Sequence, residues 1–300
     1  MVLDPVRAVT DRLDAVIVSQ AEPLEAGGRT VQGWIATAFR FGGSAGQSTK
    51  NVLNGVWLGH PLHPALTDVP IGAWTTSLIF DLLGLDRSAD ATLTLGVVAS
   101  IPTALAGAAD WVDAGDEPRR VGFLHALLNV GALCLYLASM RARAAGSRAL
   151  GVGLSATGFG IAALSAWLGG ELVYRHGTSV NRNAWREPVQ DFQVAADAAS
   201  LQEGRLSAGK ISVNGQDVPL VLLKRGTEIL ALGGTCSHWG GPLGEGKLVD
   251  HDCVQCPWHG SHFDMRDGSV HKGPATAPAP VFETRVRDGR VEVRTRILTA

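Results

Sequence analysis

The sequence predicts a multi-domain chain, with an N-terminal all-α bundle of four transmembrane helices followed by a C-terminal all-β domain. Three observations lead to this fold class. Long runs without charged residues are confined to the first 180 residues, and short alternating runs separated by Gly, Asp and Pro begin near residue 191. Charged residues make up only 18% of the chain. The mean hydropathy of +0.14 suits a chain that is half membrane protein and half soluble domain.

The predicted helices follow from the charge-free runs. A helix needs about 20 apolar residues to cross a bilayer, and Asp, Glu, Lys and Arg are absent from residues 91–109, 121–140 and 149–170. A fourth, weaker run covers residues 69–85 and is interrupted only by Asp81. A soluble helical bundle would need charged helix faces, which these runs lack. We therefore expect a four-helix membrane domain at residues 51–180.

The segments on either side of the helices are predicted to differ in character. The first 50 residues carry both acidic and basic side chains and no apolar stretch before a cleavage site, so no signal peptide is expected. They are predicted to form a short amphipathic helix and a Gly-rich linker around residues 42–46. A second linker is expected at residues 181–190. Strands are predicted at residues 218–223, 229–232 and 291–293 of a β domain covering residues 191–300.

Charge and cysteine content exclude two classes of protein. A formal net charge of −2 at pH 7 does not suit a nucleic-acid-binding protein. The four cysteines are unevenly spaced, which excludes a small secreted disulfide scaffold.

Lysine and arginine near the helix ends favour cytoplasmic termini. Four helices place both termini and the second loop on one side of the membrane, and that side carries six of these residues: Lys50, Arg119, Arg120, Arg175, Arg182 and Arg186. The other side carries four: Arg87, Arg141, Arg143 and Arg148. We therefore expect a multi-pass protein of the inner (cytoplasmic) membrane whose β domain is cytoplasmic.

The strongest motif lies in the β domain. It consists of Cys236-Ser237-His238 and, after seventeen intervening residues, Cys256-Pro257-Trp258-His259-Gly260-Ser261. Two Cys and two His suit zinc, but zinc sites usually pair a C-x-x-C with a second pair of like ligands. Here each loop supplies one thiolate and one imidazole. Two sulfide-bridged irons, one with two thiolates and one with two imidazoles, need such a set.

This segment resembles the Rieske 2Fe–2S domain over about residues 190–297. Further matching features are Gly241-Pro242-Leu243, Gly244, Gly246, Gly260-Ser261, Phe263-Asp264, Gly268 and Pro274. The resemblance implies a small antiparallel β-sandwich with a 2Fe–2S cluster at its tip. It implies that Cys236 and Cys256 hold the inner iron, and that His238 and His259 hold the outer, more exposed iron.

Departures from the family pattern concern the surroundings of the cluster. Proteins of the cytochrome bc type have a disulfide-forming cysteine at the positions of Gly241 and Trp258. Ser261 matches the serine that hydrogen-bonds a cluster sulfide, whereas Phe263 replaces a tyrosine of the high-potential type. Because hydrogen bonds to cluster sulfur raise the potential, we expect a low or intermediate potential. Pro242 and Trp258 are predicted to lie beside the cluster, and Cys253 to be a structural or free thiol.

Four histidines in the helical part form a weaker constellation: His60, His63, His125 and His176. The segments Gly59-His60-Pro61-Leu62-His63-Pro64 and Gly169-Gly170-Glu171-Leu172-Val173-Tyr174-Arg175-His176-Gly177 resemble a four-helix bacterial membrane family known as domain of unknown function 2231. Topology places all four at one membrane face. Three interpretations are open: the histidines cap helices or lie in solvent, they bind a haem b or a metal ion, or they line a quinone site. His251, His262 and His271 are predicted to be surface residues.

The predicted function is a membrane-anchored carrier of single electrons between a membrane redox centre, with haem or quinone as candidates, and a soluble partner protein such as an oxygenase. An oxygenase needs a large catalytic domain, and only about forty residues follow His259. The alternative is a non-catalytic redox sensor whose cluster switches a protein interaction. The expected partners are a redox protein and the lipid bilayer, and not nucleic acid.

Overall fold

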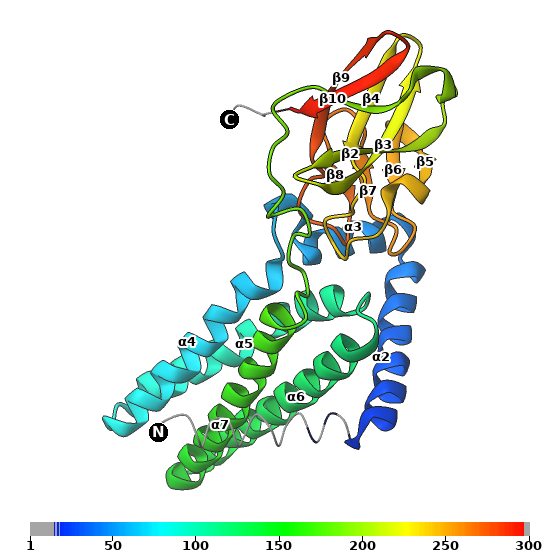
Figure 1. Cartoon of the computed structure of the whole chain (residues 1–300). Helices are drawn as coiled ribbons and strands as arrows, with labels where there is room; N and C mark the ends of the chain where they lie inside the picture. The colour runs from blue at the N-terminus through cyan, green and yellow to red at the C-terminus, as the bar shows by residue number, and fades with distance from the viewer. Residues whose placement is uncertain (1–14, 16, 18, 297–300) are drawn as a thin grey trace. The chain divides into compact units, whose positions relative to one another are not determined.

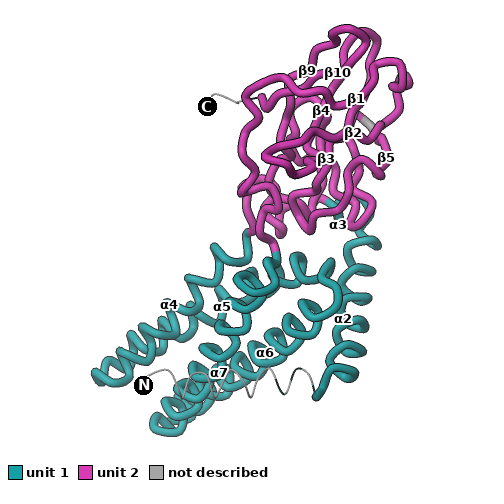
Figure 2. The backbone as a smooth tube through the Cα atoms, viewed as in Figure 1, with its two compact units in different colours: residues 1–47, 62–178 teal, residues 48–61, 179–300 magenta. Residues whose placement is uncertain are grey.

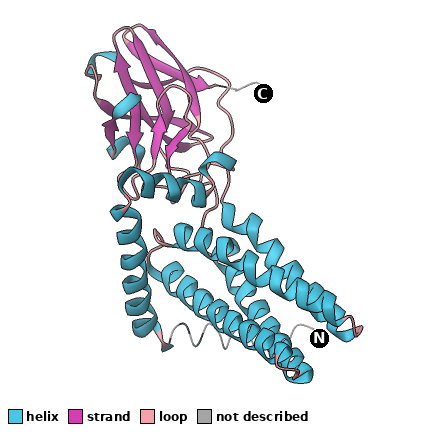
Figure 3. Cartoon of the chain, turned by 180° about the vertical axis from the view of Figure 1, so that it is seen from behind, coloured by secondary structure: helices cyan, strands magenta, loops and turns pink. Residues whose placement is uncertain are grey.

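The computed structural model describes residues 15, 17 and 19–296. Two compact units divide the chain, one made of residues up to 47 and 62–178, the other of residues 48–61 and 179–300 (Figure 2). These bounds differ from the predicted domain ranges in assigning residues 51–61 and 181–190 to the β unit. The first unit is helical, and the second carries every strand among the described residues (Figure 3).

The helical unit contains α2 (Ala21–Phe41), α4 (Leu62–Leu82), α5 (Asp86–Trp111), α6 (Asp116–Ala144) and α7 (Arg148–Tyr174) (Figure 1). Three of these, α5, α6 and α7, are long and apolar enough to cross a membrane. The predicted count of four spans is not confirmed, because α4 is not among the described helices that meet this criterion. It also begins seven residues before the predicted run at residue 69, so His63 lies inside the helix.

The prediction of a Gly-rich linker at residues 42–46 is wrong. Gly43 has a φ of +54° and separates α2 from a further helix, α3 (Gly43–Asn54). At Gly46 a β-carbon would lie 2.0 Å from the carbonyl oxygen of Phe39, so glycine is required there by a close backbone approach and not by flexibility. The predicted amphipathic helix is present in its described part as α2, and residues 1–14, 16 and 18 lie outside the described residues.

Helix α2 is fixed to the bundle by polar contacts. Gln32 donates from Nε2 to the carbonyl oxygens of Trp111 (2.8 Å) and Ala114 (2.9 Å), and Glu25 forms an ion pair with Arg119. These contacts join α2 to the turn after α5 and to the first turn of α6.

The helices α4 to α7 are a tandem repeat of one helical hairpin, with an offset of 62 residues. The histidines show it most directly. His63 Nδ1 lies 2.9 Å from the carbonyl oxygen of Thr103, and His125 Nδ1 lies 2.7 Å from that of Ser165; both pairs are 40 residues apart. The α4–α5 hairpin therefore uses the same interhelical bond as the α6–α7 hairpin.

A second bond repeats with the same offset. Ser77 Oγ donates to the carbonyl oxygen of Ala89 at 2.8 Å, and Ser139 Oγ donates to that of Gly151 at 2.6 Å, both over 12 residues. The glycines repeat too, as Gly84 and Gly146, Gly96 and Gly158, and Gly107 and Gly169. Few other positions are identical, which explains why reading the sequence did not reveal the repeat.

Counterparts in the two hairpins meet each other inside the bundle. The pairs are His63 with His125 (ring centres 6.4 Å apart), Trp74 with Tyr136 (stacked at 4.2 Å), and Asp81 with Arg143 (2.5 Å). Contacts between a residue and its own counterpart in the other hairpin indicate that a two-fold pseudo-axis relates the two hairpins and passes between the paired residues. Because both hairpins run in the same direction, this axis is parallel to the helices.

The β unit is built from two antiparallel sheets, which confirms the predicted all-β class and antiparallel strands. One sheet has the order β1-β10-β9-β4-β3-β2 and the other β5-β6-β7-β8. The strands are β1 (Gln193–Asp197), β2 (Leu206–Val213), β3 (Gln216–Arg225), β4 (Glu228–Gly233), β5 (Lys247–Val249), β6 (Cys253–Gln255), β7 (His262–Asp264), β8 (Val270–Lys272), β9 (Val281–Arg287) and β10 (Arg290–Thr295). The three predicted strands lie within β3, β4 and β10.

The core of the β unit joins both sheets to the loops that carry the sequence motif. Val221, Leu223 and Leu232 of the large sheet pack with Val254 and Phe263 of the small sheet. Two cysteines of the sequence motif belong to the same buried cluster. The loops that carry the motif are therefore held by the main core of this unit.

Candidate metal centre

Two loops of identical construction carry the four motif residues. In the loop after β4, the N–H of Cys236 donates to the carbonyl oxygen of Gly241 (2.8 Å) and the N–H of Gly240 donates to that of Cys236 (3.0 Å). In the loop after β6, Cys256 forms the same two bonds with Ser261 (2.8 Å) and Gly260 (3.1 Å). The glycines have φ values of +84° and +73°, a conformation that favours residues without a side chain.

The loops bring like groups together. The thiols of Cys236 and Cys256 hydrogen-bond each other, and the imidazoles of His238 and His259 lie with ring centres 5.1 Å apart and planes at 86°. The site thus has a sulfur end and a nitrogen end, each drawn from both loops.

The donor set fits a binuclear centre. Among the described residues, the one group of three or more ligand atoms within 4.8 Å of each other lies elsewhere, so these four side chains do not converge on a single ion as a zinc site requires. The Nδ1 atom of His238 is buried and has no hydrogen-bond partner in the described chain. A buried nitrogen with a lone pair and no partner suits a metal ligand.

The electrostatics of the two cysteines favour a thiolate at Cys256. The hydrogen bond from Cys236 lowers the pKa of Cys256 to about 6, with help from the N–H groups of Trp258 and His259. The pKa of Cys236 is raised, because it holds the proton of this bond and is buried. Backbone N–H groups of His238 and Trp239 point at its sulfur in the same way, and such groups stabilise negative charge on sulfur.

The imidazole of His238 is neutral and shielded from solvent. Burial, followed by the positive charges of His259, Lys50 and Arg182, lowers the pKa of His238 to about 3. A neutral imidazole is the form that binds metal.

Residues predicted to surround the cluster lie beside the ligands. Ser261 is fully buried, and its Oγ accepts the N–H of Ala275 (2.9 Å), which leaves its own hydrogen for another acceptor. Phe263 is fully buried in the same cluster as the two cysteines. A β-carbon on Gly241 would lie 2.8 Å from Cys256 Sγ and 3.1 Å from the Trp258 ring. Pro242 follows Gly241 and forms a bridge with Thr235.

The two histidines differ in exposure, which corrects the expectation that both lie at an exposed tip. His238 is only 7% exposed, whereas His259 is half-buried. The lower exposure of His238 is explained by two segments, around Arg182 and at residues 48–61, which the sequence had assigned to the linker and to the membrane domain. The N–H of Arg182 donates to the carbonyl oxygen of Ser237 (3.0 Å), and its guanidinium lies 5.3 Å from the Trp239 ring. This segment covers the first loop only.

Residues 48–61 also contact the β unit near the site. Asn51 Oδ1 accepts the N–H of Gly273 at 3.1 Å, and a β-carbon on Gly273 would lie 3.1 Å from Val56. The second loop stays more open, and the Trp258 side chain is 56% exposed.

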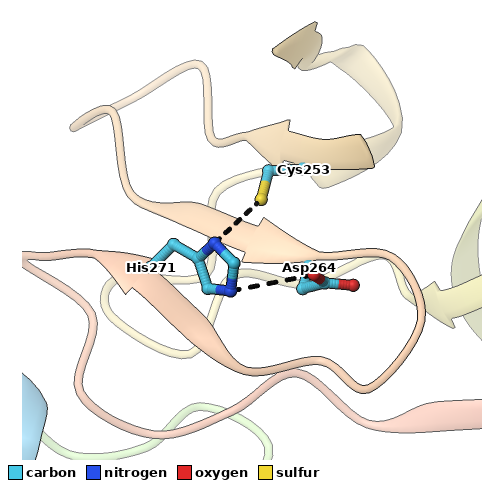
Figure 4. A group of neighbouring side chains, drawn as sticks. All are labelled: Cys253, Asp264 and His271. Atoms are coloured by element: carbon cyan, nitrogen blue, oxygen red, sulfur yellow. Dashed lines mark hydrogen bonds and ion pairs between the residues drawn. The ribbon is translucent and has the colours of Figure 1, made fainter. Parts of the chain in front are cut away.

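A further cluster, which sequence reading missed, joins Cys253, Asp264 and His271 on β6, β7 and β8 (Figure 4). Cys253 Sγ lies 3.5 Å from His271 Nδ1, and His271 Nε2 lies 3.7 Å from Asp264 Oδ2. The cysteine and the aspartate contact opposite nitrogens of one ring, so the imidazole bridges them. Burial, with the nearby carboxylates, raises the pKa of the Cys253 thiol to about 11. Cys253 is thus a buried, protonated structural thiol.

The structure brings together two of the four helical histidines. His63 and His125 form the pair described above. His176 follows α7 and is half-buried. His60 is exposed in the turn before α4 and belongs to the β unit.

Comparison with known proteins agrees with this site. The model of the Rieske [2Fe-2S] domain matches residues 191–283, and that of a predicted membrane protein family (DUF2231) matches residues 59–182. The chain is 39% identical over 75 residues to the anthranilate 1,2-dioxygenase ferredoxin subunit of Burkholderia cepacia, covering 25% of this chain and 68% of that protein. It is 39% identical to ferredoxin CarAc of Metapseudomonas resinovorans, covering 25% and 69%.

These matches define an iron–sulfur protein with a membrane-protein domain. The chain belongs to the Rieske [2Fe-2S] family through residues 191–283, and its helical part matches the model of the DUF2231 family over residues 59–182. A solved complex of oxygenase and ferredoxin in carbazole 1,9a-dioxygenase is similar at 30% identity and a TM-score of 0.32, covering 36% of this chain and 98% of that one. The comparisons support a 2Fe–2S cluster and supply no support for a haem or a quinone.

Proposed function

We propose that this protein is a membrane-anchored Rieske electron carrier that delivers single electrons to an oxygenase-type partner. The observation that carries the proposal is the 39% identity of its β unit to ferredoxin subunits of dioxygenases. The pairing of two thiols and two imidazoles from matched loops supports it. In this proposal Cys236 and Cys256 hold one iron, and His238 and His259 hold the other, as in mixed-ligand clusters of this type.

The cluster would supply one-electron redox chemistry. The chain's own residues would set its potential and its access. Backbone N–H groups of both loops stabilise negative charge on the ligand sulfurs. Phe263 offers no hydroxyl group, which favours the lower part of the range of about −150 to +300 mV covered by Rieske centres. Because the first loop is covered and the second is not, the electron would leave near His259 and the exposed Trp258.

The helical unit would serve as the anchor, with the β unit in the cytoplasm. Three helices of sufficient length and hydropathy support a multi-pass arrangement. The proposal includes the inner membrane and α4 as a fourth span, because an even number of spans places both termini, with their Lys and Arg residues, on the cytoplasmic side.

Anaerobic mixing tests the proposed function. The full-length protein in membrane vesicles, reduced with one electron per cluster, is mixed with the oxygenase component of an aromatic-ring dioxygenase. The proposal predicts that the cluster reoxidises as the oxygenase cluster gains one electron, and that product forms when oxygen is admitted. An oxidation-dependent change in binding without electron transfer would favour the alternative role as a redox sensor. Extraction of the protein from vesicles by alkaline carbonate would contradict the anchor.

A further inference from the structure

The two histidines on the pseudo-axis of the helical unit share one protonation state. The carbonyl oxygens of Thr103 and Ser165 only accept hydrogen bonds, so Nδ1 of His63 and Nδ1 of His125 both carry the proton. Each Nε2 atom therefore bears a lone pair. Asn129 Nδ2, which only donates, lies 3.1 Å from His125 Nε2 and requires the same tautomer. A metal bound at His125 Nε2 would replace this hydrogen bond. A carbonyl on the distal nitrogen is the usual partner of a metal-binding imidazole.

The spacing of the rings suits ligation from opposite sides of one metal ion. A bond from imidazole nitrogen to a metal is about 2.0 Å long, so two opposed imidazoles have ring centres roughly 6 Å apart. The centres of His63 and His125 are 6.4 Å apart, with the ring planes at 90°. The histidines come from α4 and α6, which lie diagonally across the bundle because each of them packs on both α5 and α7.

The flanking helices make room for both rings at equivalent positions. A β-carbon on Gly107 of α5 would lie 2.9 Å from the His63 ring, and one on Gly169 of α7 would lie 3.5 Å from the His125 ring. Glycine is therefore required beside His63, whereas a β-carbon at position 169 would be in ordinary contact with His125. Thr103 and Ser165, one turn away on the same helices, hold the rings.

The number of protein ligands decides the kind of metal group. Among the residues that the structure describes, Cys253, Asp264 and His271 form the one group of three or more converging His, Cys, Asp and Glu ligands. The histidine pair therefore supplies two ligands, fewer than the three or four with which proteins hold zinc. A metal between the rings must bring its other ligands with it. Haem iron does so, because its porphyrin leaves two opposite positions for axial imidazoles.

We propose that His63 and His125 are the two axial ligands of a haem bound on the pseudo-axis of the duplicated hairpin. His60 and His176 take no part. The inference extends the proposed function, on which it rests for its redox role, and it would give the membrane unit a one-electron centre of its own. The haem-binding claim itself depends only on the helical unit.

Optical and EPR spectra of the full-length protein test this proposal. The protein is expressed with haem supplied and purified in detergent, and porphyrin and iron are quantified. The proposal predicts one haem per chain in addition to the 2Fe–2S cluster. Because the ring planes are perpendicular, the ferric haem should give a highly anisotropic low-spin EPR signal and not the rhombic signal of parallel imidazoles. Absence of porphyrin from protein that holds its cluster, or copper or zinc in its place, overturns the proposal.

Variants separate the ligands from the other histidines. His63→Ala and His125→Ala should each lose haem or convert it to a high-spin form, whereas His60→Ala and His176→Ala should keep the wild-type spectrum. His63→Met, which retains an axial ligand, should bind haem with an altered spectrum; this guards against loss through misfolding. The signal of the reduced cluster, measured in the same samples, should be unchanged throughout. An unchanged haem spectrum in both His63→Ala and His125→Ala overturns the assignment, and loss of the cluster signal alone counts against the proposed function instead.

Discussion

The carboxylate of Asp81 and the guanidinium of Arg143 occupy equivalent positions in the two hairpins and form an ion pair of 2.5 Å. Both side chains are almost fully buried, at 0% and 3% exposure. Arg148 makes a second ion pair with Asp81, also at 2.5 Å, and Arg143 reaches Asp90. One network therefore joins all four helices of the repeat at one end of the bundle. Asp81, which interrupted the predicted first span, is satisfied by residues of the second hairpin.

We predict that Asp81→Asn destabilises the helical unit by about 3–5 kcal/mol, because it removes the buried one of the two carboxylates that pair with Arg143 and Arg148 and leaves the half-exposed Asp90. Thermal unfolding in detergent measures the effect. Asp86→Asn is the matched control: Asp86 also pairs with Arg148 but is 64% exposed, so its loss should cost less than about 1 kcal/mol. Equal effects of the two substitutions would contradict a buried network.

The cysteines of the β unit provide a second test. Cys256→Ser should abolish the cluster, since its thiolate is proposed as a ligand, while the protein remains in the membrane. Cys253→Ser should retain the cluster, because Cys253 contacts His271 and is not one of the four proposed ligands. Iron content and the EPR signal of the reduced protein distinguish the two. Unchanged iron content in Cys256→Ser would refute the ligand assignment.

The raised pKa of Cys253 predicts an unusual pH dependence of alkylation. Thiolate is the reactive form, so modification by iodoacetamide should keep rising up to a pH of about 11. Nearby carboxylates contribute to the raised pKa, and Asp264→Asn should therefore lower it and speed the reaction at a given pH. The measurement uses the cluster-loaded protein with Cys134→Ala, which removes the exposed thiol of α6. A rate that levels off near the ordinary value of 9.0 would show that Cys253 is not buried.

The hydrogen bonds around the cluster predict opposite shifts of the reduction potential. Phe263→Tyr should raise the potential by adding a donor, and Ser261→Ala should lower it by removing one, because donors to cluster sulfur favour the reduced state. Voltammetry of the full-length protein checks both. If Phe263→Tyr lowers stability with no change of potential, the new hydroxyl does not reach the cluster, and Phe263 is a core residue only.

The β unit was predictable because its motif is local. Each loop carries its ligands within four residues, and the alternating runs gave three strands in the right places. The cover over His238 was not predictable, since Arg182 comes from a predicted linker and Asn51 from the predicted membrane domain. Their role depends on long-range contacts with Ser237 and Gly273.

The helical unit shows a similar limit. Apolar runs predicted α5, α6 and α7 but placed the start of α4 too late, because His63 and Pro64 interrupt the hydrophobic pattern although both lie in the helix. The repeat was hidden because most counterparts share a role and not an identity. Asp81 and Arg143 even have opposite charges, and they are recognised as equivalent by the offset of 62 residues together with their contact.

The EPR spectrum of the reduced protein in isolated membranes shows whether a membrane-bound cluster with two histidine ligands is present. Two imidazoles on one iron lower the average g value below that of a ferredoxin whose cluster has four cysteine ligands. The account predicts this low-g signal in the membrane fraction for the wild type and for Cys253→Ser, and its absence in Cys256→Ser and His259→Ala. A signal with the average g of an all-cysteine ferredoxin, or iron bound without a binuclear signal, would contradict the account.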